Sequence, residues 1–165
     1  MNGLLIGRFQ PFHKGHLAAG DFALSKVEIL WIGIGSSNKS FEKRNPFTAD
    51  ERRKMILSTL DPKRQKRTKI YYIPDTGDHE RWTYHVDSIV PTYDVVFSND
   101  NFTINLYKKR GKNVIEVPLL DRNIISGTNI RELIVRGKDW LNLVPEGTQK
   151  VLLKIEAHSR LEAIL

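Results

Sequence analysis

The sequence predicts one doubly wound α/β domain built on a parallel β-sheet. Short apolar runs alternate with longer amphipathic segments, a spacing typical of strand–helix–strand units with right-handed crossovers. The 165 residues are enough for one domain with a proper core. No linker, repeat or low-complexity tract divides the chain. We therefore expect a single domain over residues 1–165, with a helical C-terminal segment from about residue 127.

Five apolar runs are the expected strands. The first, GLLIG, is typical of a buried strand, and the second, EILWIGIG, is rich in β-branched residues and ends in glycine. Trp31 lies inside the second run, where we expect it to serve packing. The five runs cover residues 3–7, 28–35, 69–74, 93–98 and 113–118.

The amphipathic segments between these runs are the expected helices. The best-marked start is TADERRKMILSTL, where Thr48 and Glu51 form a capping-box pattern. Gly111 suits the C-terminal end of another helix. The expected helices cover residues 16–26, 48–60, 81–90 and 101–111, followed by the region from about residue 127 with a break near 144–148.

The formal charge of +7 and the pI near 9.7 are compatible with nucleic acid, an anionic membrane or an anionic small substrate. Much of the charge lies in DPKRQKRTK, residues 61–69, which we interpret as a solvated loop, with a peripheral anion or subunit contact as the alternative. No RNA-binding aromatic signature or zinc-finger spacing accompanies it. We therefore expect no nucleic-acid partner.

The chain has no cysteine, which excludes disulfides, thiolate metal sites and a thiol nucleophile. The apolar run at the N-terminus is too short for a signal peptide, and no stretch approaches the length of a membrane span. The expected location is cytoplasmic, with no membrane partner.

The stretch GRFQPFHKGHL, residues 7–17, follows the first strand, where doubly wound sheets bind their ligands. A helix beginning near Gly15 presents free N–H groups and its positive dipole end to a phosphate. Arg8 and the imidazoles of His13 and His16 add hydrogen-bond donors. Gly15 lets a ligand approach the backbone closely. This stretch therefore favours phosphate binding.

Other roles for the two histidines remain open on these residues alone. The alternatives are helix caps, buried hydrogen-bonded side chains and a nucleophilic histidine. Their spacing of three also suits a metal, but a zinc site needs a third ligand, and no nearby carboxylate or cysteine supplies one.

Two motifs carry a resemblance to a known family. His13-Lys14-Gly15-His16 matches the HxGH pattern of the nucleotidylyltransferase superfamily, and ISGTNIRELI, about 110 residues later, resembles its second signature. More narrowly, GRFQPFHKGH, NPFTADER and SGTNIR are similar to archaeal-type nicotinamide-nucleotide adenylyltransferases. The resemblance spans Gly7 to about Pro145. It implies a Rossmann-like nucleotidylyltransferase fold.

The resemblance also implies roles for particular residues. It places four residues at the reacting phosphates: His13, His16, Arg44 and Arg131. It places eight more around ATP: Gly7, Arg8, Phe9, Gly15, Asn99, Ser126, Gly127 and Thr128. Plain N-capping is the alternative for Ser126 and Thr128. Lys39 or Lys43 is the alternative to Arg44, and we interpret Arg52 as a structural ion-pair former that is also a candidate for a supporting role in the site.

By the same resemblance, Trp82 stacks on a flat cationic nicotinamide ring, with a place in the core as the alternative. The neighbouring stretch DTGDHERW departs from the family pattern, so the resemblance assigns no role to residues 75–80.

The implied reaction is adenylyl transfer from ATP to nicotinamide mononucleotide, giving NAD and pyrophosphate by in-line attack. Such a reaction needs positive donors around phosphates more than an acid–base pair. Mg²⁺ is expected to accompany ATP, held mainly by substrate oxygens and water. The resemblance also implies a homo-oligomer, a hexamer. The alternatives are another acceptor, such as pantetheine phosphate, FMN or an alcohol phosphate, and a non-catalytic binder of nucleotide or nucleic acid.

Overall fold

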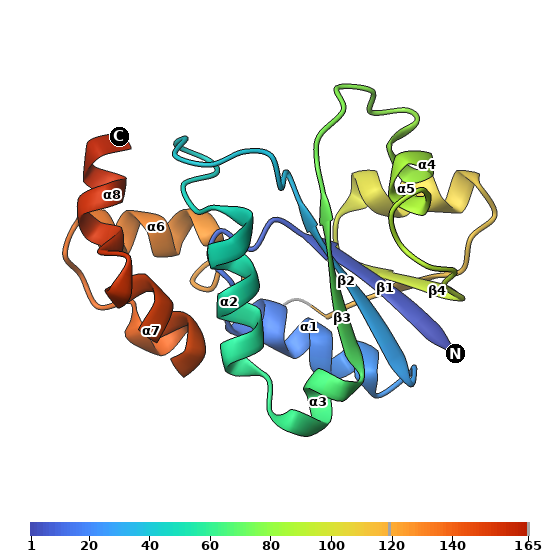
Figure 1. The fold of residues 1–165 in the computed structure, drawn as a ribbon, viewed down its shortest axis with the longest axis horizontal. Coiled ribbons are helices and arrows are strands. Elements are labelled where there is room, and N and C mark those ends of the chain that lie inside the picture. The colour runs from blue at the N-terminus through green and yellow to red at the C-terminus, as the bar shows by residue number, and fades with distance from the viewer. Residues whose placement is uncertain (119, 165) are drawn as a thin grey trace.

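The computed structural model describes residues 1–118 and 120–164, and within them five parallel strands form one sheet (Figure 1). The strand order is β3-β2-β1-β4-β5, so the predicted doubly wound parallel sheet is confirmed. The strands are β1 (Asn2–Gly7), β2 (Ile29–Gly35), β3 (Thr68–Ile73), β4 (Val95–Ser98) and β5 (Val114–Glu116).

Helices cover both faces of this sheet. One face packs against α1 (Lys14–Leu24) and α2 (Ala49–Thr59), and the other against α4 (Trp82–Asp87) and α5 (Asn101–Lys109). Alternate residues of β1 serve the two faces: Leu5 belongs to the first core and Leu4 to the second. Each face thus has its own apolar core.

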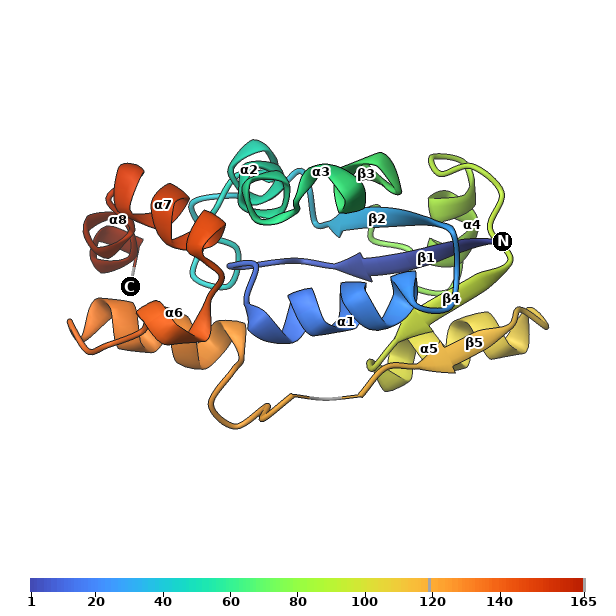
Figure 2. The same ribbon diagram turned by 90° about the horizontal axis from the view of Figure 1, so that it is seen from below.

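The C-terminal helices gather at one end of the sheet, beside α2 (Figures 1 and 2). They are α6 (Gly127–Val135), α7 (Glu146–Lys154) and α8 (Ala157–Ile164), with a 3₁₀ turn, η1 (Leu141–Leu143), between α6 and α7. The predicted break near residues 144–148 is confirmed, because α7 begins there. A second break follows α6 at Gly137, whose φ of +67° ends the helix.

The chain reverses direction across the sheet between β1 and β4. It proceeds outward from β1 to β2 and β3, and then crosses back to β4 on the far side of β1. The loops that leave β1 and β4 therefore diverge onto opposite faces and open a crevice at the carboxyl edge of the sheet.

The predicted elements agree with the structure to within a few residues. The predicted capping box of α2 is present, because Thr48 Oγ1 accepts the Glu51 N–H at 3.1 Å and Glu51 Oε1 accepts the Thr48 N–H at 2.8 Å. Trp31 packs against Tyr71, as expected, and its indole N–H donates to the Thr92 carbonyl.

The prediction that residues 61–69 form a loop is wrong, although most of the segment is exposed to solvent as expected. This segment forms the short helix α3 (Pro62–Lys66) and the start of β3. Asp61 caps α3 by accepting the Arg64 N–H at 2.8 Å, and Pro62 occupies the first helical position. An Asp-Pro pair suits a helix start as well as a loop, and the sequence alone does not separate the two.

Two arginines of residues 61–69 form polar contacts with the segment of residues 21–28. The Arg64 guanidinium pairs with Asp21 of α1 at 2.8 Å, and Arg67 donates to three carbonyls between residues 24 and 28.

Across the described ranges, no helix has both the length and the apolar character needed to cross a membrane.

Candidate active site

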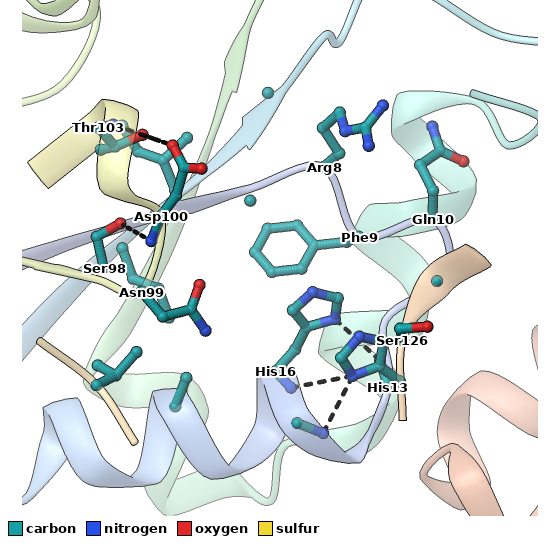
Figure 3. A pocket seen from close by; sticks show the side chains of 18 of the residues that line it. Arg8, Phe9, Gln10, His13, His16, Ser98, Asn99, Asp100, Thr103 and Ser126 are labelled. Atoms are coloured by element: carbon teal, nitrogen blue, oxygen red, sulfur yellow. Dashed lines mark hydrogen bonds between the residues drawn. The ribbon is translucent and has the colours of Figure 1, made fainter. Parts of the chain in front are cut away.

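A cavity of about 520 Å³ opens at the carboxyl edge of the sheet, where the loops that follow β1 and β4 diverge. Figure 3 shows Phe9, His13, His16 and Ser126 on one side of it and Asn99 on the other. Of the thirteen residues predicted for the site, twelve line this cavity: Gly7, Arg8, Phe9, His13, Gly15, His16, Trp82, Asn99, Ser126, Gly127, Thr128 and Arg131. Arg44 is the exception.

Each of the two histidine rings accepts hydrogen bonds from backbone N–H groups at the start of α1, including an N–H of the other histidine. His13 Nδ1 accepts the N–H groups of Gly15 and His16 at 3.1 and 3.3 Å, and His16 Nδ1 accepts the His13 N–H at 3.1 Å. The rings stack with their centroids 3.6 Å apart (Figure 3). An Nδ1 that accepts a hydrogen bond carries no proton, so the proton of each neutral ring lies on Nε2.

Both imidazoles are neutral near pH 7. Burial lowers the pKa of His13 to about 4. Burial, together with the adjacent His13, lowers the pKa of His16 well below its ordinary value. Phe9 contacts the His16 ring edge-on at 4.8 Å, and Phe12 stacks on it at 5.7 Å. Capping and ligand binding are therefore compatible, since each Nδ1 serves the helix and each Nε2–H remains a neutral donor.

Three glycines of the site leave room for its own side chains. A Cβ at Gly15 would lie 2.9 Å from the His13 ring, and one at Gly7 would lie 2.9 Å from the Phe9 ring. A Cβ at Gly127 would lie 2.8 Å from the Arg131 guanidinium. The sequence suggested that Gly15 lets a ligand approach the backbone closely. The structure adds a second reason for glycine at this position, because a side chain would clash with the His13 ring.

Arg8 and Arg131 line the cavity, and a third arginine, Arg44, acts on both by its charge. Arg131 Nη1 donates to the Gln10 carbonyl at 2.7 Å, and burial, with Arg8 and Arg44 nearby, lowers its pKa to about 10. Burial and Arg44 also lower the pKa of Arg8, while Asp75 opposes the shift. Arg44 is exposed, yet its charge acts on both other guanidinium groups. Among the described residues none of the three arginines forms an ion pair, so the cluster suits an anion.

The N-terminus of α6 adds backbone donors to the same cavity. Ser126 Oγ accepts the Asn129 N–H at 3.1 Å, which confirms its role as N-cap. Gly127 and Thr128 occupy the first turn, where N–H groups have no partner within the helix. Capping by Ser126 therefore leaves neighbouring amides for a ligand.

Arg52 is not the ion-pair former that the sequence suggested. It is fully buried, and its guanidinium donates at 2.8–3.3 Å to five carbonyl groups. These carbonyls belong to Arg8, Gly35, Ser36, Lys39 and Thr48. Burial lowers its pKa to about 10. Arg52 thus ties the loop after β1 to the loop after β2, a contact between distant segments that no local pattern predicts.

Trp82 serves the cavity and the core together. Its half-buried ring lines the cavity and lies 6.4 Å from the Tyr107 ring in the second core. From residues 75–80, the structure brings Asp75 and His79 to the cavity. Asp75 accepts hydrogen bonds from Ser36 Oγ at 3.0 Å and lies 3.6 Å from Lys39 Nζ. Lys39, the alternative to Arg44 as a phosphate-binding residue, is therefore paired with Asp75.

Sequence reasoning missed several cavity residues. Gln10 exchanges two hydrogen bonds with the Phe47 backbone, at 3.0 and 3.2 Å, and so joins the loop after β1 to the segment before α2. Asp100 caps α5, and Arg122 reaches the cavity from the segment before α6. Gln10 lies inside the stretch GRFQPFHKGHL, whereas only its charge could have indicated Arg122 in the sequence.

Within the described ranges, no three His, Cys, Asp or Glu residues are grouped to hold a metal ion.

The fold and the site define a doubly wound α/β protein of the nucleotide-binding class, with its cavity at a topological switch point. The chain belongs to the cytidylyltransferase-like family, whose model matches residues 4–133. It is 36% identical over 165 residues to the nicotinamide-nucleotide adenylyltransferase of Pyrococcus furiosus, covering 98% of this chain and 88% of that protein. It is 38% identical to the enzyme of the same name from Archaeoglobus fulgidus, covering 99% and 97%. The resemblance drawn from the motifs is confirmed.

Solved structures agree on the fold. One is a bifunctional NMN adenylyltransferase/ADP ribose pyrophosphatase from Francisella tularensis, complexed with AMP and a Mn ion. It superposes with a TM-score of 0.75 at 20% identity, covering 98% of this chain and 52% of that one. The present chain therefore spans about half the length of that bifunctional protein. A solved structure from Vibrio parahaemolyticus gives a TM-score of 0.67 at 16% identity, covering 95% of this chain and 94% of that one.

Proposed function

We propose that this protein transfers the adenylyl group of ATP to nicotinamide mononucleotide, giving NAD and pyrophosphate. The observation that carries the proposal is the convergence of Arg8 and Arg131 with two neutral imidazole donors at one cavity, where the charge of Arg44 acts on both guanidinium groups. The names of the archaeal relatives supply the adenylyl donor and the acceptor.

The reaction needs little covalent help from the protein. The phosphate of the mononucleotide attacks the α-phosphorus of ATP, and the bond to the bridging oxygen of the β-phosphate breaks as pyrophosphate leaves. Repulsion between anions and charge on the departing group limit the rate. We assign Arg8, Arg44 and Arg131 to charge neutralisation, and the Nε2–H groups of His13 and His16 to hydrogen bonds with ATP phosphate oxygens. Neutral imidazoles do this without taking up a proton.

The ATP contacts extend to both walls of the cavity. We assign the amides of Gly127 and Thr128 and the Ser126 hydroxyl to the triphosphate, and Asn99 to the adenine side. Gly7, Phe9 and Gly15 shape the wall around the phosphates. Mg²⁺ is proposed to enter with ATP and to balance phosphate charge, bound by substrate oxygens and water in a cavity rich in donors rather than carboxylates.

Trp82 is proposed to hold the nicotinamide ring. A tryptophan face attracts a flat cationic ring by stacking and cation–π interaction, and the half-buried Trp82 ring borders the cavity. This face favours a nicotinamide nucleotide over pantetheine phosphate or an alcohol phosphate, neither of which has a ring. The hexameric assembly, the cytoplasmic location and the absence of nucleic-acid or membrane partners remain predictions.

One assay tests the proposed function directly. Purified protein with Mg-ATP is offered nicotinamide mononucleotide, nicotinate mononucleotide, pantetheine phosphate, FMN and, with CTP, an alcohol phosphate, and pyrophosphate release is followed. We expect the highest kcat/KM with nicotinamide mononucleotide and NAD as the product. Higher kcat/KM with pantetheine phosphate or FMN would contradict the assigned acceptor, and no release with any acceptor would contradict catalysis.

A further inference from the structure

The segment that carries Arg44 is a tight turn on the protein surface, here called the Arg44 turn (residues 41–46). The N–H and carbonyl groups of Glu42 and Asn45 hydrogen-bond reciprocally at 3.1 and 3.2 Å, and the Phe41 N–H donates to the Pro46 carbonyl at 3.3 Å. Phe41 has a φ of +55°, a conformation that residues other than glycine rarely adopt. Arg44 thus lies at the tip of a turn whose ends meet at Phe41 and Pro46.

Arg160, on the C-terminal helix α8, holds both ends of this turn. Its guanidinium lies 4.5 Å from the centre of the Phe41 ring, and its Nη1 donates to the Pro46 carbonyl at 3.4 Å. Its two terminal nitrogens also form a bidentate ion pair with Glu51 at 2.5 and 2.8 Å. Both side chains of this pair are only 15% exposed, so water screens the pair less than a surface ion pair.

Glu51 connects this contact to the start of α2. The same carboxylate accepts the Thr48 N–H in the capping box, so Arg160, Glu51 and Thr48 form one continuous set of hydrogen bonds. The arrangement links α8 to the turn and to the helix that follows it. Helices α7 and α8 lie beyond residue 133, where the family model ends.

Among the described residues the exposed Arg44 side chain forms no ion pair, so its position depends on the backbone of the turn. The charge of Arg44 acts on Arg8 and Arg131, both of which belong to the cavity. An exposed arginine without an ion-pair partner samples many rotamers unless its backbone is held in place.

We propose that Arg160 is a positioning residue for Arg44, so that the C-terminal helix forms part of the ATP site. This inference rests on the proposed function, because Arg44 matters only if phosphates bind beside it. Arg160 itself touches no substrate. It acts by fixing the Arg44 turn against Glu51 and α2.

A mutant cycle tests the proposal. The variants are Arg160→Gln, Arg44→Gln and the double variant, measured for kcat, KM for ATP, KM for nicotinamide mononucleotide, and the Kd of ATP by calorimetry. Misplacement of a phosphate-binding group by an ångström costs up to about 100-fold, so we expect Arg160→Gln to lower kcat/KM for ATP by about 10- to 100-fold. KM for the mononucleotide should change less. The double variant should match Arg44→Gln within about twofold, because Arg160 acts through Arg44.

Two results would overturn the proposal. One is a folded Arg160→Gln protein with wild-type kcat/KM and Kd for ATP, and the other is an equal loss from Arg160→Gln in the Arg44→Gln background. The matched control is Arg64→Gln, which removes the Arg64–Asp21 ion pair between α3 and α1. It should lower Tm slightly at most and leave kinetics unchanged.

Two further arms keep the test decisive. If Arg160→Gln does not fold, the cycle is run with Arg160→Lys, which keeps the charge but not the bidentate geometry. Wild-type turnover reports on the proposed function, whereas differences between variants report on Arg160. If the wild-type protein makes no NAD, the Kd of ATP supplies the same cycle.

Discussion

At the scale of single residues, each histidine ring of the HxGH pattern has two roles. Each of His13 and His16 uses Nδ1 to accept backbone N–H groups at the start of α1 and leaves Nε2–H as a donor at the cavity. The glycine between them is required because a Cβ at Gly15 would contact the His13 ring. The spacing of the pattern therefore follows from reciprocal capping as much as from ligand binding.

Two substitutions of His16 separate these roles. Asparagine keeps an oxygen near the position of Nδ1 and can still cap the His13 N–H, but it has no group at the position of Nε2. Glutamine places an amide N–H near the position of Nε2 and lacks the cap. We expect His16→Asn to lower kcat by about 100-fold or more with a small change in Tm, and His16→Gln to retain more activity with a lower Tm. Steady-state kinetics and thermal unfolding check this, and near-normal kcat in His16→Asn would remove the imidazole from the mechanism.

The buried neutral His13 makes stability depend on pH. Its pKa is about 4 in the folded protein, against 6.5 ordinarily, so the unfolded chain binds more protons between these values. Stability is therefore full above pH 6.5 and is lost as the pH falls toward 4, by about 3 kcal/mol from this group. Urea unfolding from pH 4 to 7 measures the effect. His13→Asn keeps an N-cap without titrating and should make the pH dependence less steep, with His16 supplying the remainder, and an unchanged slope in this variant would contradict the assignment.

At the scale of elements, the carboxyl edge of the sheet places segments from both ends of the chain in one cavity. The loop after β1 meets the N-terminus of α6 through the hydrogen bond from Arg131 to the Gln10 carbonyl. Gly127 lies under this bond, since a Cβ there would come within 2.8 Å of Arg131 Nη1 and 3.0 Å of the Gln10 oxygen. The contact between the loop after β1 and α6 thus requires glycine at position 127.

Alanine at Gly127 should therefore damage binding more than folding. The added Cβ displaces Arg131 from the cavity wall, and we expect kcat/KM for ATP to fall by about tenfold or more, since an ångström of misplacement is costly. Gly20→Ala is the matched control, because nothing lies within 4 Å of a Cβ at that position of α1. It should raise stability by about 0.5–1 kcal/mol and leave kinetics unchanged. Equal kinetics for the two variants would show that Arg131 need not occupy its present place.

Prediction from sequence succeeded where local chemistry decides the structure. Alternating apolar runs identified the five strands, and the capping pattern at Thr48 and Glu51 identified α2. Twelve residues that the resemblance to the family placed in the site line the cavity, and most of them lie at strand ends or helix starts. The sequence did not indicate that Arg52 is buried among carbonyls or that Arg160 pairs with Glu51. Both depend on packing between segments far apart in the chain, which periodicity and capping patterns do not encode.

At the scale of the whole molecule, the cationic residues behind the net charge of +7 include two groups with different consequences. One group is the cluster around the cavity, which includes Arg8, Arg44 and Arg131. The other includes the exposed Lys63 and Lys66 of α3, which precedes β3 and so lies at the amino edge of the sheet. The six residues of β3, at about 3.3 Å each, separate the two edges by about 20 Å.

Removing charge from each group tests which one recruits ATP. Screening at 0.15 M ionic strength acts over roughly 8 Å, so the distant lysines contribute little to the field at the cavity. We expect Lys63→Gln/Lys66→Gln to change kcat/KM for ATP by less than about twofold at 0.15 M, with a larger effect at 0.01 M, where the screening length is about 30 Å. Arg44→Gln should lower kcat/KM at both ionic strengths, because the lost contact is local. Measurement of kcat/KM across a salt series decides the matter. An equal loss from the lysine pair at 0.15 M would mean that net charge, rather than the arrangement of the cavity, draws the anionic substrate in.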